Sequence, residues 1–164
     1  MPKTLFLLRH AKSSWKDLSI PDHDRKLNKR GLHDAPRMAA WMQESGHHPD
    51  WMICSTAVRT TATAEALETV FGQSIPLEFE ERLYMASPGK LIQCITKKAP
   101  EVHSAIAVGH NPGLEDLAYS LVGEPIRIPT MTLVSISLPL DHWVEFSSQT
   151  RGTLNFVMRP KMLP

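Results

Sequence analysis

Short apolar runs alternate along this chain with longer segments of helical periodicity. Continuous apolar stretches predict buried strands over residues 3–8, 51–55, 75–79 and 104–108. Apolar residues spaced three or four positions apart predict helices over residues 28–45, 57–71, 87–98 and 114–122. Strands that alternate with helices are typical of an α/β domain with a largely parallel sheet.

The first predicted helix has clear boundary signals. Asn28 is a good N-cap, and Gly46 follows the last residue of the pattern. Pro36 lies inside the pattern, so we expect it to bend the helix or to delay its start. The expected buried stripe consists of Leu32, Ala35, Ala39 and Met42.

The end of the chain has a different pattern. Residues 132–138 and 152–158 alternate between apolar and polar positions, which predicts two further strands. No internal repeat or low-complexity tract interrupts the chain. Its 164 residues therefore predict one domain over residues 1–164.

Composition and charge narrow the class of protein. An apolar fraction of 42% with 21% charged residues is typical of a globular domain and too apolar for disorder. The 18 Lys+Arg against 17 Asp+Glu give a formal net charge of +1, without the basic excess of a nucleic-acid or membrane-surface protein. Any anion site must therefore come from local placement of arginine and histidine.

The two cysteines and the N-terminus indicate a compartment. Cys54 and Cys94 lie in a predicted strand and a predicted helix, which favours two buried, reduced thiols over a disulfide. The apolar run near the N-terminus is too short for a signal peptide, and Arg9 closes it. No stretch approaches the ~18 apolar residues of a membrane span. We expect a soluble cytoplasmic protein.

Candidate chemistry follows three of the predicted strands. Arg9 and His10 come after the first strand, Arg59 opens the helix after the second, and His110 comes after the fourth. Ligands of open α/β sheets bind beyond the carboxyl ends of the strands, so these side chains should meet at one edge. Two guanidinium groups and a helix N-terminus suit a phosphate dianion, and two imidazoles point to phosphoryl transfer on nitrogen.

The same residues carry a family resemblance. Leu8-Arg9-His10-Ala11 resembles the Arg-His-Gly signature of the histidine phosphatase (phosphoglycerate-mutase-like) superfamily, with Ala11 where glycine is usual. The stretch Ser55-x-x-x-Arg59-x-x-x-Thr63-Ala64 resembles its second motif, and Val108-Gly109-His110-Asn111 resembles its third. The loop Asp22-x-x-Arg25-x-Leu27 and the Leu83-Tyr84 segment look most like the SixA-type phosphohistidine phosphatases.

The resemblance implies a fold and a mechanism. The fold would be a three-layer α/β/α sandwich with a mostly parallel mixed sheet. His10 would be the nucleophile and would form a phosphohistidine intermediate, Arg9 and Arg59 would hold the phosphate oxygens, and His110 would complete the pocket. We expect the neighbouring arginines to keep His10 neutral, with its second ring N–H held by a backbone carbonyl. The implied substrate is phosphohistidine on a protein such as a histidine phosphotransfer domain, in signal transduction, with no cofactor or metal.

The proton donor for the leaving group stays open at this point. Glu80 and Glu81 are candidates, as is Asp22, which could protonate the leaving group or orient water. A phosphohistidine substrate tolerates the lack of an acid, because imidazole leaves more readily than an alkoxide. Arg25 is either a further phosphate or substrate contact or the partner of a loop ion pair.

Two other functions compete with this one. One is a phosphatase of the same superfamily that acts on small phosphate esters or other phosphoproteins, and the other is a non-catalytic phosphoprotein-binding module. The chain lacks the glycine-rich, Walker and zinc motifs of cofactor enzymes and metalloenzymes. His47 and His48 flank a predicted turn and are expected to be solvated instead of binding metal.

Overall fold

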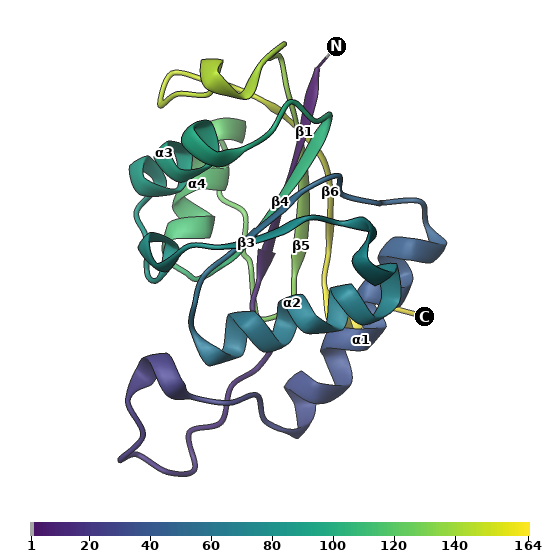
Figure 1. Ribbon diagram of the computed structural model, residues 1–164, viewed down its shortest axis with the longest axis vertical. Helices are drawn as coiled ribbons and strands as arrows, with labels where there is room; N and C mark the ends of the chain where they lie inside the picture. Colours follow the sequence, from purple (N-terminus) through teal and green to yellow (C-terminus); the bar gives the residue numbers. More distant parts are fainter. Residues whose placement is uncertain (1) are drawn as a thin grey trace.

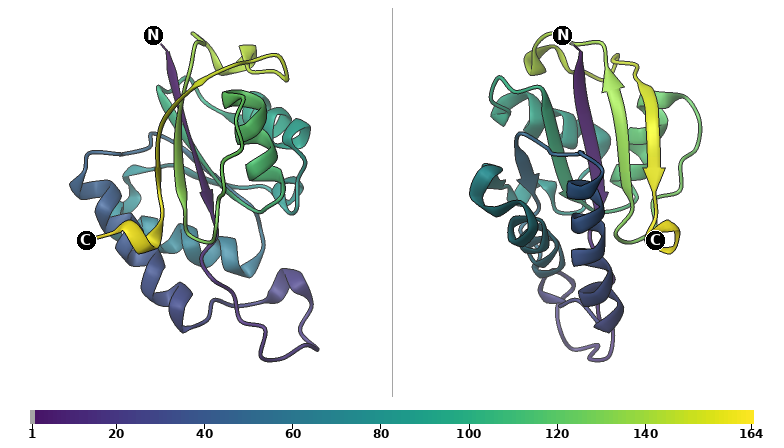
Figure 2. Two further views of the ribbon diagram at one scale, coloured as in Figure 1. Left: turned by 180° about the vertical axis from the view of Figure 1, so that it is seen from behind. Right: turned by 90° about the vertical axis from the view of Figure 1, so that its right-hand side faces the viewer.

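The computed structural model describes residues 2–164, in which one six-stranded sheet lies between two pairs of helices (Figures 1 and 2). The strands are β1 (Lys3–Arg9), β2 (Met52–Cys54), β3 (Leu77–Phe79), β4 (Ser104–Gly109), β5 (Leu133–Leu138) and β6 (Thr153–Met158). Their order across the sheet is β3-β2-β4-β1-β5-β6. The first four strands are parallel, and β5 pairs antiparallel with both β1 and β6. The prediction of a mostly parallel mixed sheet is confirmed.

The helices cover both faces of this sheet. They are α1 (Lys29–Glu44), α2 (Val58–Phe71), α3 (Pro88–Lys98) and α4 (Gly113–Val122). Phe6 and Leu8 of β1 pack with α1 and α2, while Leu5 and Leu7 pack with α3 and α4 on the opposite face. Alternate strand residues thus enter two separate cores, as the period of a strand requires. The three-layer sandwich is confirmed.

Helix α1 differs from the prediction in two ways, which concern the effect of Pro36 and the burial of Leu32. It begins at Lys29, where the Asn28 side chain accepts a hydrogen bond from the Gly31 amide at 2.9 Å, and it continues through Pro36. Proline therefore does not delay the helix. Leu32 is 64% exposed instead of buried, and Gly31 occupies the inward position. A Cβ atom at Gly31 would lie 2.2 Å from the carbonyl oxygen of Lys12, so only glycine fits where the helix meets this loop.

The parallel strands β1, β2 and β4 end at one edge of the sheet, at the bottom of Figure 1. The long polar loop of residues 11–28 lies beyond this edge, whereas the N-terminus lies at the opposite edge. Long loops inside compact domains are often functional. Because these strands are parallel, the residues that follow them reach the same edge. Arg9 and His10 come at the end of β1, Arg59 after β2 and His110 after β4.

Two further expectations are tested by the fold. Cys54 and Cys94 are both free and buried, as predicted. Over residues 2–164 no helix combines the length and apolar character needed to cross a membrane.

Candidate active site

A cavity of about 330 Å³ opens at the carboxyl edge of the sheet. The structure brings four predicted residues together in its wall, namely Arg9, His10, Arg59 and His110. Asp22 of the first loop lines it as well. The other lining residues are Lys12, Ser13, Trp15, Met85, Asn111 and Thr130.

His10 is held in one orientation at the end of β1. The residue is 5% exposed, and Nδ1 lies 2.7 Å from the carbonyl oxygen of Ala11. A carbonyl only accepts hydrogen bonds, so the proton of the neutral ring is on Nδ1. Nε2 therefore keeps its lone pair, as a nucleophile must.

Arg59 connects the two imidazoles. Its Nε donates to Nε2 of His10 at 3.3 Å, and its Nη2 lies 3.4 Å from Nδ1 of His110. The other nitrogen of His110, Nε2, lies 2.7 Å from the Ser55 hydroxyl. The ring centroids of His10 and His110 are 5.3 Å apart, so one phosphoryl group can touch both rings and the guanidinium.

Both imidazoles are neutral at physiological pH. Burial, with the positive charges of Arg59 and Arg9 adding to it, lowers the pKa of His10 to about 4. Burial and the adjacent His10 and Arg59 lower the pKa of His110 to about 3. The expectation that the arginines keep His10 uncharged agrees with these directions, although burial contributes more than the charges.

Arg9 has unused hydrogen-bonding capacity. Its Nη1 donates to the carbonyl of Ile128 at 3.3 Å, whereas its buried Nε has no partner in the part of the chain that the structure describes. Burial lowers the pKa of this guanidinium, and nearby Glu115 opposes that shift. A buried donor without a partner is costly, so a phosphate oxygen that accepts from Arg9 removes a penalty as it binds.

Asp22 and Tyr84 form a polar wall beside Arg59. The Asp22 carboxylate accepts from Arg59 Nη2 at 2.9 Å, and its main-chain carbonyl accepts from Nη1 at 2.6 Å. The Tyr84 hydroxyl donates a short hydrogen bond to the same carboxylate. Tyr84 and Arg59 hold the pKa of Asp22 below its usual range. Asp22 is therefore ionised at neutral pH, which favours water orientation over proton donation.

Tyr84 was not predicted as a site residue. Its ring meets the His110 ring edge-on, with centroids 5.2 Å apart, and lies 5.9 Å from the Arg59 guanidinium. His23, for which the sequence predicts no role, packs against Tyr84 and hydrogen-bonds Thr56 Oγ1 at 3.0 Å. The sequence does point to this region, because the Leu83-Tyr84 segment is part of the SixA-type resemblance. The resemblance nevertheless assigns no role to the Tyr84 side chain.

Three other candidates lie away from the cavity. Arg25 stacks on Trp15, with its guanidinium carbon 3.8 Å from the ring centroid, and donates to the Asp17 carbonyl at 3.2 Å. Glu80 pairs with Arg82 at 2.6 Å, and these bonds lower its pKa to about 2. Glu81 is exposed and lines a neighbouring hollow with Tyr84. The structure thus places Arg25 in loop packing and neither glutamate beside His10.

Gly113 fixes the His110 loop against the segment that carries Tyr84. A Cβ atom at Gly113 would lie 1.9 Å from the carbonyl oxygen of Ala86, so the two backbones touch directly. Helix α4 begins at Gly113, three residues after His110. The spacing between His110 and Tyr84 is therefore set by backbone contact.

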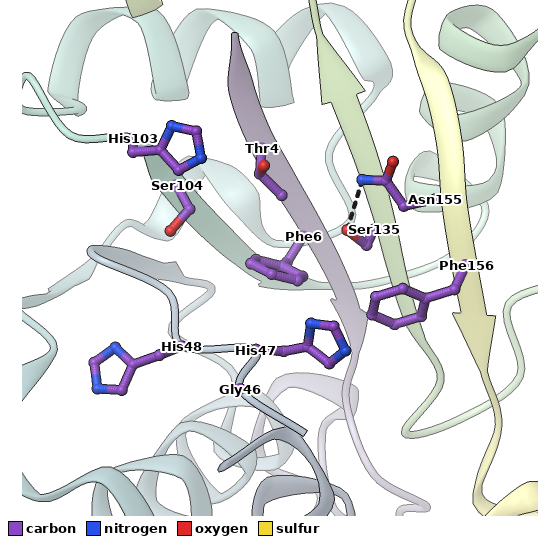
Figure 3. Close-up of a pocket in the computed structure, with 10 residues that line it drawn as sticks. All are labelled: Thr4, Phe6, Gly46, His47, His48, His103, Ser104, Ser135, Asn155 and Phe156. Carbon is purple, nitrogen blue, oxygen red and sulfur yellow. Dashed lines mark hydrogen bonds between the residues drawn. The ribbon is translucent and has the colours of Figure 1, made fainter. Parts of the chain in front are cut away.

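A second hollow of about 330 Å³ lies at the opposite edge of the sheet (Figure 3). Figure 3 shows the His47 ring beside Phe6 and Phe156 while His48 points away from it, and the His47 and Phe156 centroids are 4.6 Å apart. Its Asn155 donates to Ser135 at 3.1 Å. Residues 2–164 contain no group of three or more His, Cys, Asp or Glu side chains arranged to hold a metal.

Comparisons with known proteins agree with this geometry. Residues 5–112 match the model of the histidine phosphatase superfamily, branch 1. An uncharacterised chloroplastic protein of Arabidopsis thaliana is 32% identical over 152 residues, covering 87% of this chain and 70% of that protein. A 2,3-bisphosphoglycerate-dependent phosphoglycerate mutase of Clavibacter sepedonicus is 32% identical over 136 residues, covering 76% of this chain and 54% of the mutase.

Solved structures include SixA proteins. A phosphohistidine phosphatase SixA of Agrobacterium tumefaciens, described as putative, has a TM-score of 0.83 at 28% identity, covering 98% of this chain and 99% of that one. The corresponding protein of Nakamurella multipartitia has a TM-score of 0.83 at 25% identity, covering 98% and 97%. With its three motifs and this fold, the chain belongs to the histidine phosphatase superfamily, branch 1, and is of the SixA type.

Proposed function

We propose that this phosphatase removes the phosphoryl group from a histidine of another protein through a phospho-His10 intermediate. One observation carries the proposal. The cavity holds a neutral imidazole between two arginines. Among the described residues that line it, Asp22 alone has a carboxyl group, and that group is ionised. Such a site has a nucleophile and charge stabilisation but no carboxylic acid to protonate an alkoxide. It suits a substrate whose leaving group departs without an acid.

The first step exchanges one P–N bond for another. The substrate ring enters with its unphosphorylated nitrogen protonated. Nε2 of His10 attacks phosphorus, the P–N bond of the substrate breaks, and its electron pair returns to the substrate nitrogen, which leaves as neutral imidazole. Phospho-His10 is then an imidazolium whose Nδ1–H stays bonded to the Ala11 carbonyl. Arg9 and Arg59 hold the phosphoryl oxygens while charge moves across them, and the His110 ring lies beside them.

The second step regenerates the enzyme. Water attacks phosphorus, the bond to Nε2 breaks, and His10 recovers its lone pair with Nδ1 still protonated. The proton lost by water leaves with the phosphate, so the step needs no other reactant. In this proposal the ionised Asp22, held by Arg59 and Tyr84, accepts a hydrogen bond from that water.

Two observations support a protein substrate and catalysis. The cavity is lined by exposed Trp15 and Lys12 of the first loop, which leaves its mouth accessible to a side chain on a large partner. A binding module needs the arginines alone, whereas the anchored tautomer of His10 serves a nucleophile. The SixA proteins of similar fold are named as phosphohistidine phosphatases, in agreement with this proposal.

A comparative hydrolysis assay tests the proposal. We expect a phosphorylated histidine phosphotransfer domain to be hydrolysed with a higher kcat/KM than p-nitrophenyl phosphate or a sugar phosphate. Acid-labile phosphate should be trapped on the wild-type chain during turnover and be absent from His10→Ala. Faster turnover of the small esters would instead favour the ester phosphatase, the alternative that the related mutase keeps open.

A further inference from the structure

A second cationic hollow adjoins the active site. It encloses about 480 Å³ and is lined by Arg9, Glu115, Arg127, Pro129, Arg159 and Lys161. The side chains come from the end of β1, the start of α4, the connection before β5 and the C-terminal turn. Figure 2 shows the C-terminal turn beside the connection that leads into β5. Four positive charges face one negative charge, in a chain whose formal net charge is only +1.

The outer cations of this hollow lack acidic partners. Among the ion pairs formed within 4.0 Å over residues 2–164, none includes Arg127, Arg159 or Lys161. Arg159 donates only to the carbonyl of Arg127, at 2.9 Å. Glu115 is already engaged, because its Oε2 accepts from the Ile128 amide at 2.7 Å. The hollow therefore keeps its positive charge.

Arg9 connects the hollow to the phosphate site. Its side chain lines both cavities, and the adjacent residues Pro129 and Thr130 line one cavity each. A protein segment whose phosphorylated residue reaches His10 can therefore place neighbouring side chains close to Arg127, Arg159 and Lys161. Unpaired cations on long side chains at an open surface attract carboxylates and raise association rates.

We propose that this hollow docks an acidic segment of the phosphoprotein substrate, so that Arg127, Arg159 and Lys161 select proteins with aspartate or glutamate near the phosphorylated residue. The inference rests on the proposed function and adds the substrate class. Charge complementarity identifies the occupant. A neighbouring hollow is also lined by three cations, Lys16, Lys29 and Arg30, but Arg30 pairs with Asp34 at 3.5 Å.

The test uses two histidine-phosphorylated peptides of equal length, one with flanking glutamates and one with glutamines. We expect kcat/KM to be about tenfold higher for the glutamate peptide at low salt, with the preference lost as salt is added. In Arg127→Glu/Lys161→Glu, the ratio of kcat/KM for the glutamate peptide to that for p-nitrophenyl phosphate should fall about tenfold or more. Lys97→Glu, at an exposed lysine near the end of α3, where the chain returns to the opposite edge of the sheet, is the control matched in charge to each single reversal, Arg127→Glu or Lys161→Glu.

A binding measurement separates this inference from the proposed function. Fluorescence anisotropy of the unphosphorylated, labelled glutamate and glutamine peptides should show tighter binding of the glutamate peptide to the wild type, abolished in the double variant and kept in Lys97→Glu. Equal binding of the two peptides, or unchanged binding by the double variant, overturns the docking inference. If neither phosphopeptide is hydrolysed, the proposed function fails, while the anisotropy still decides whether the hollow docks acidic segments.

Discussion

Two hollows of equal volume, about 330 Å³ each, lie at opposite edges of the same sheet, and both are lined by histidines. At the carboxyl edge, His10 and His110 are buried beside arginines, and Arg9 has a donor without a partner. At the amino edge, His47 packs on aromatic rings, and the amide of Asn155 is satisfied by Ser135 and Ser137.

The difference lies in which polar groups remain available to a ligand. Burial alone lowers the pKa of His47, with no cation contributing, whereas Arg59 and Arg9 also lower that of His10. A histidine becomes a nucleophile when its tautomer is fixed and charge stabilisation stands next to it. Only the carboxyl edge has both conditions within residues 2–164.

The largest expected difference in activity is between substitutions of His10, in the active-site cavity, and of His47, in the hollow at the opposite edge. His10→Ala should lower kcat by 10³-fold or more, because it removes the atom that accepts the phosphoryl group. His47→Ala should keep kcat/KM within about twofold and lower the free energy of unfolding by about 1 kcal/mol through lost ring packing. Steady-state kinetics and urea unfolding measure both. Residual activity of His10→Ala above ~1% would contradict the assigned nucleophile.

Arg59→Ala should have the next largest effect, with kcat/KM reduced by about 10²–10³-fold. The substitution removes the guanidinium that contacts both imidazoles and Asp22. Arg59→Lys should recover little of this loss, because an ammonium cannot reproduce the fork of donors. Arg37→Ala, at a half-exposed arginine of α1, is the control. Recovery of most activity by lysine would show that charge alone matters at this position.

The pH dependence of kcat/KM should reveal the lowered pKa of His10. The nucleophile is the neutral ring, so activity on p-nitrophenyl phosphate should persist at pH 5 and fall about tenfold per pH unit below a pKa of about 4. An unperturbed histidine would already lose activity near pH 6.5. A profile with its acid limb near that value would contradict the assigned environment.

Stability should follow the same group with a definite sign. The unfolded ring takes up a proton at higher pH than the folded ring, so the free energy of unfolding should decrease as pH falls from about 6.5 to about 4. Urea unfolding at several pH values measures this slope. His10→Ala should make it shallower, and His47→Ala should change it less.

The smallest expected effect concerns Tyr84. Tyr84→Phe keeps the ring against His110 and Arg59 but removes the hydrogen bond to Asp22, so kcat should fall only severalfold. The loss of this donor should also raise the pKa of Asp22 and shift the acid limb of the kcat profile upward. A similar loss in both kcat and stability, with an unshifted profile, would indicate a purely structural hydroxyl.

The sequence predicts the fold, and it predicts that Arg9, His10, Arg59 and His110 meet in one place, because the strand ends of a parallel sheet lie at one edge whatever the details of packing. It fails where tertiary contacts decide. Leu32 turns outward because the Lys12 carbonyl leaves room only for Gly31. Arg25 turns to Trp15, and Tyr84 reaches Asp22 across 62 positions of the chain. Such long-range pairings leave no periodic signal in a single sequence.

Because the backbones of Gly113 and Ala86 are in contact, a single methyl group added at Gly113 would change the geometry of the site. Gly113→Ala would act as a wedge between the His110 loop and the segment that carries Tyr84, since a carbonyl oxygen 1.9 Å from the new Cβ must move. Phosphoryl transfer depends on sub-ångström positioning, and a displacement far from His10 can lower its rate. The change in kcat of Gly113→Ala would therefore measure how sensitive the reaction is to the position of the His110 loop. The substitution itself replaces no group that touches phosphate.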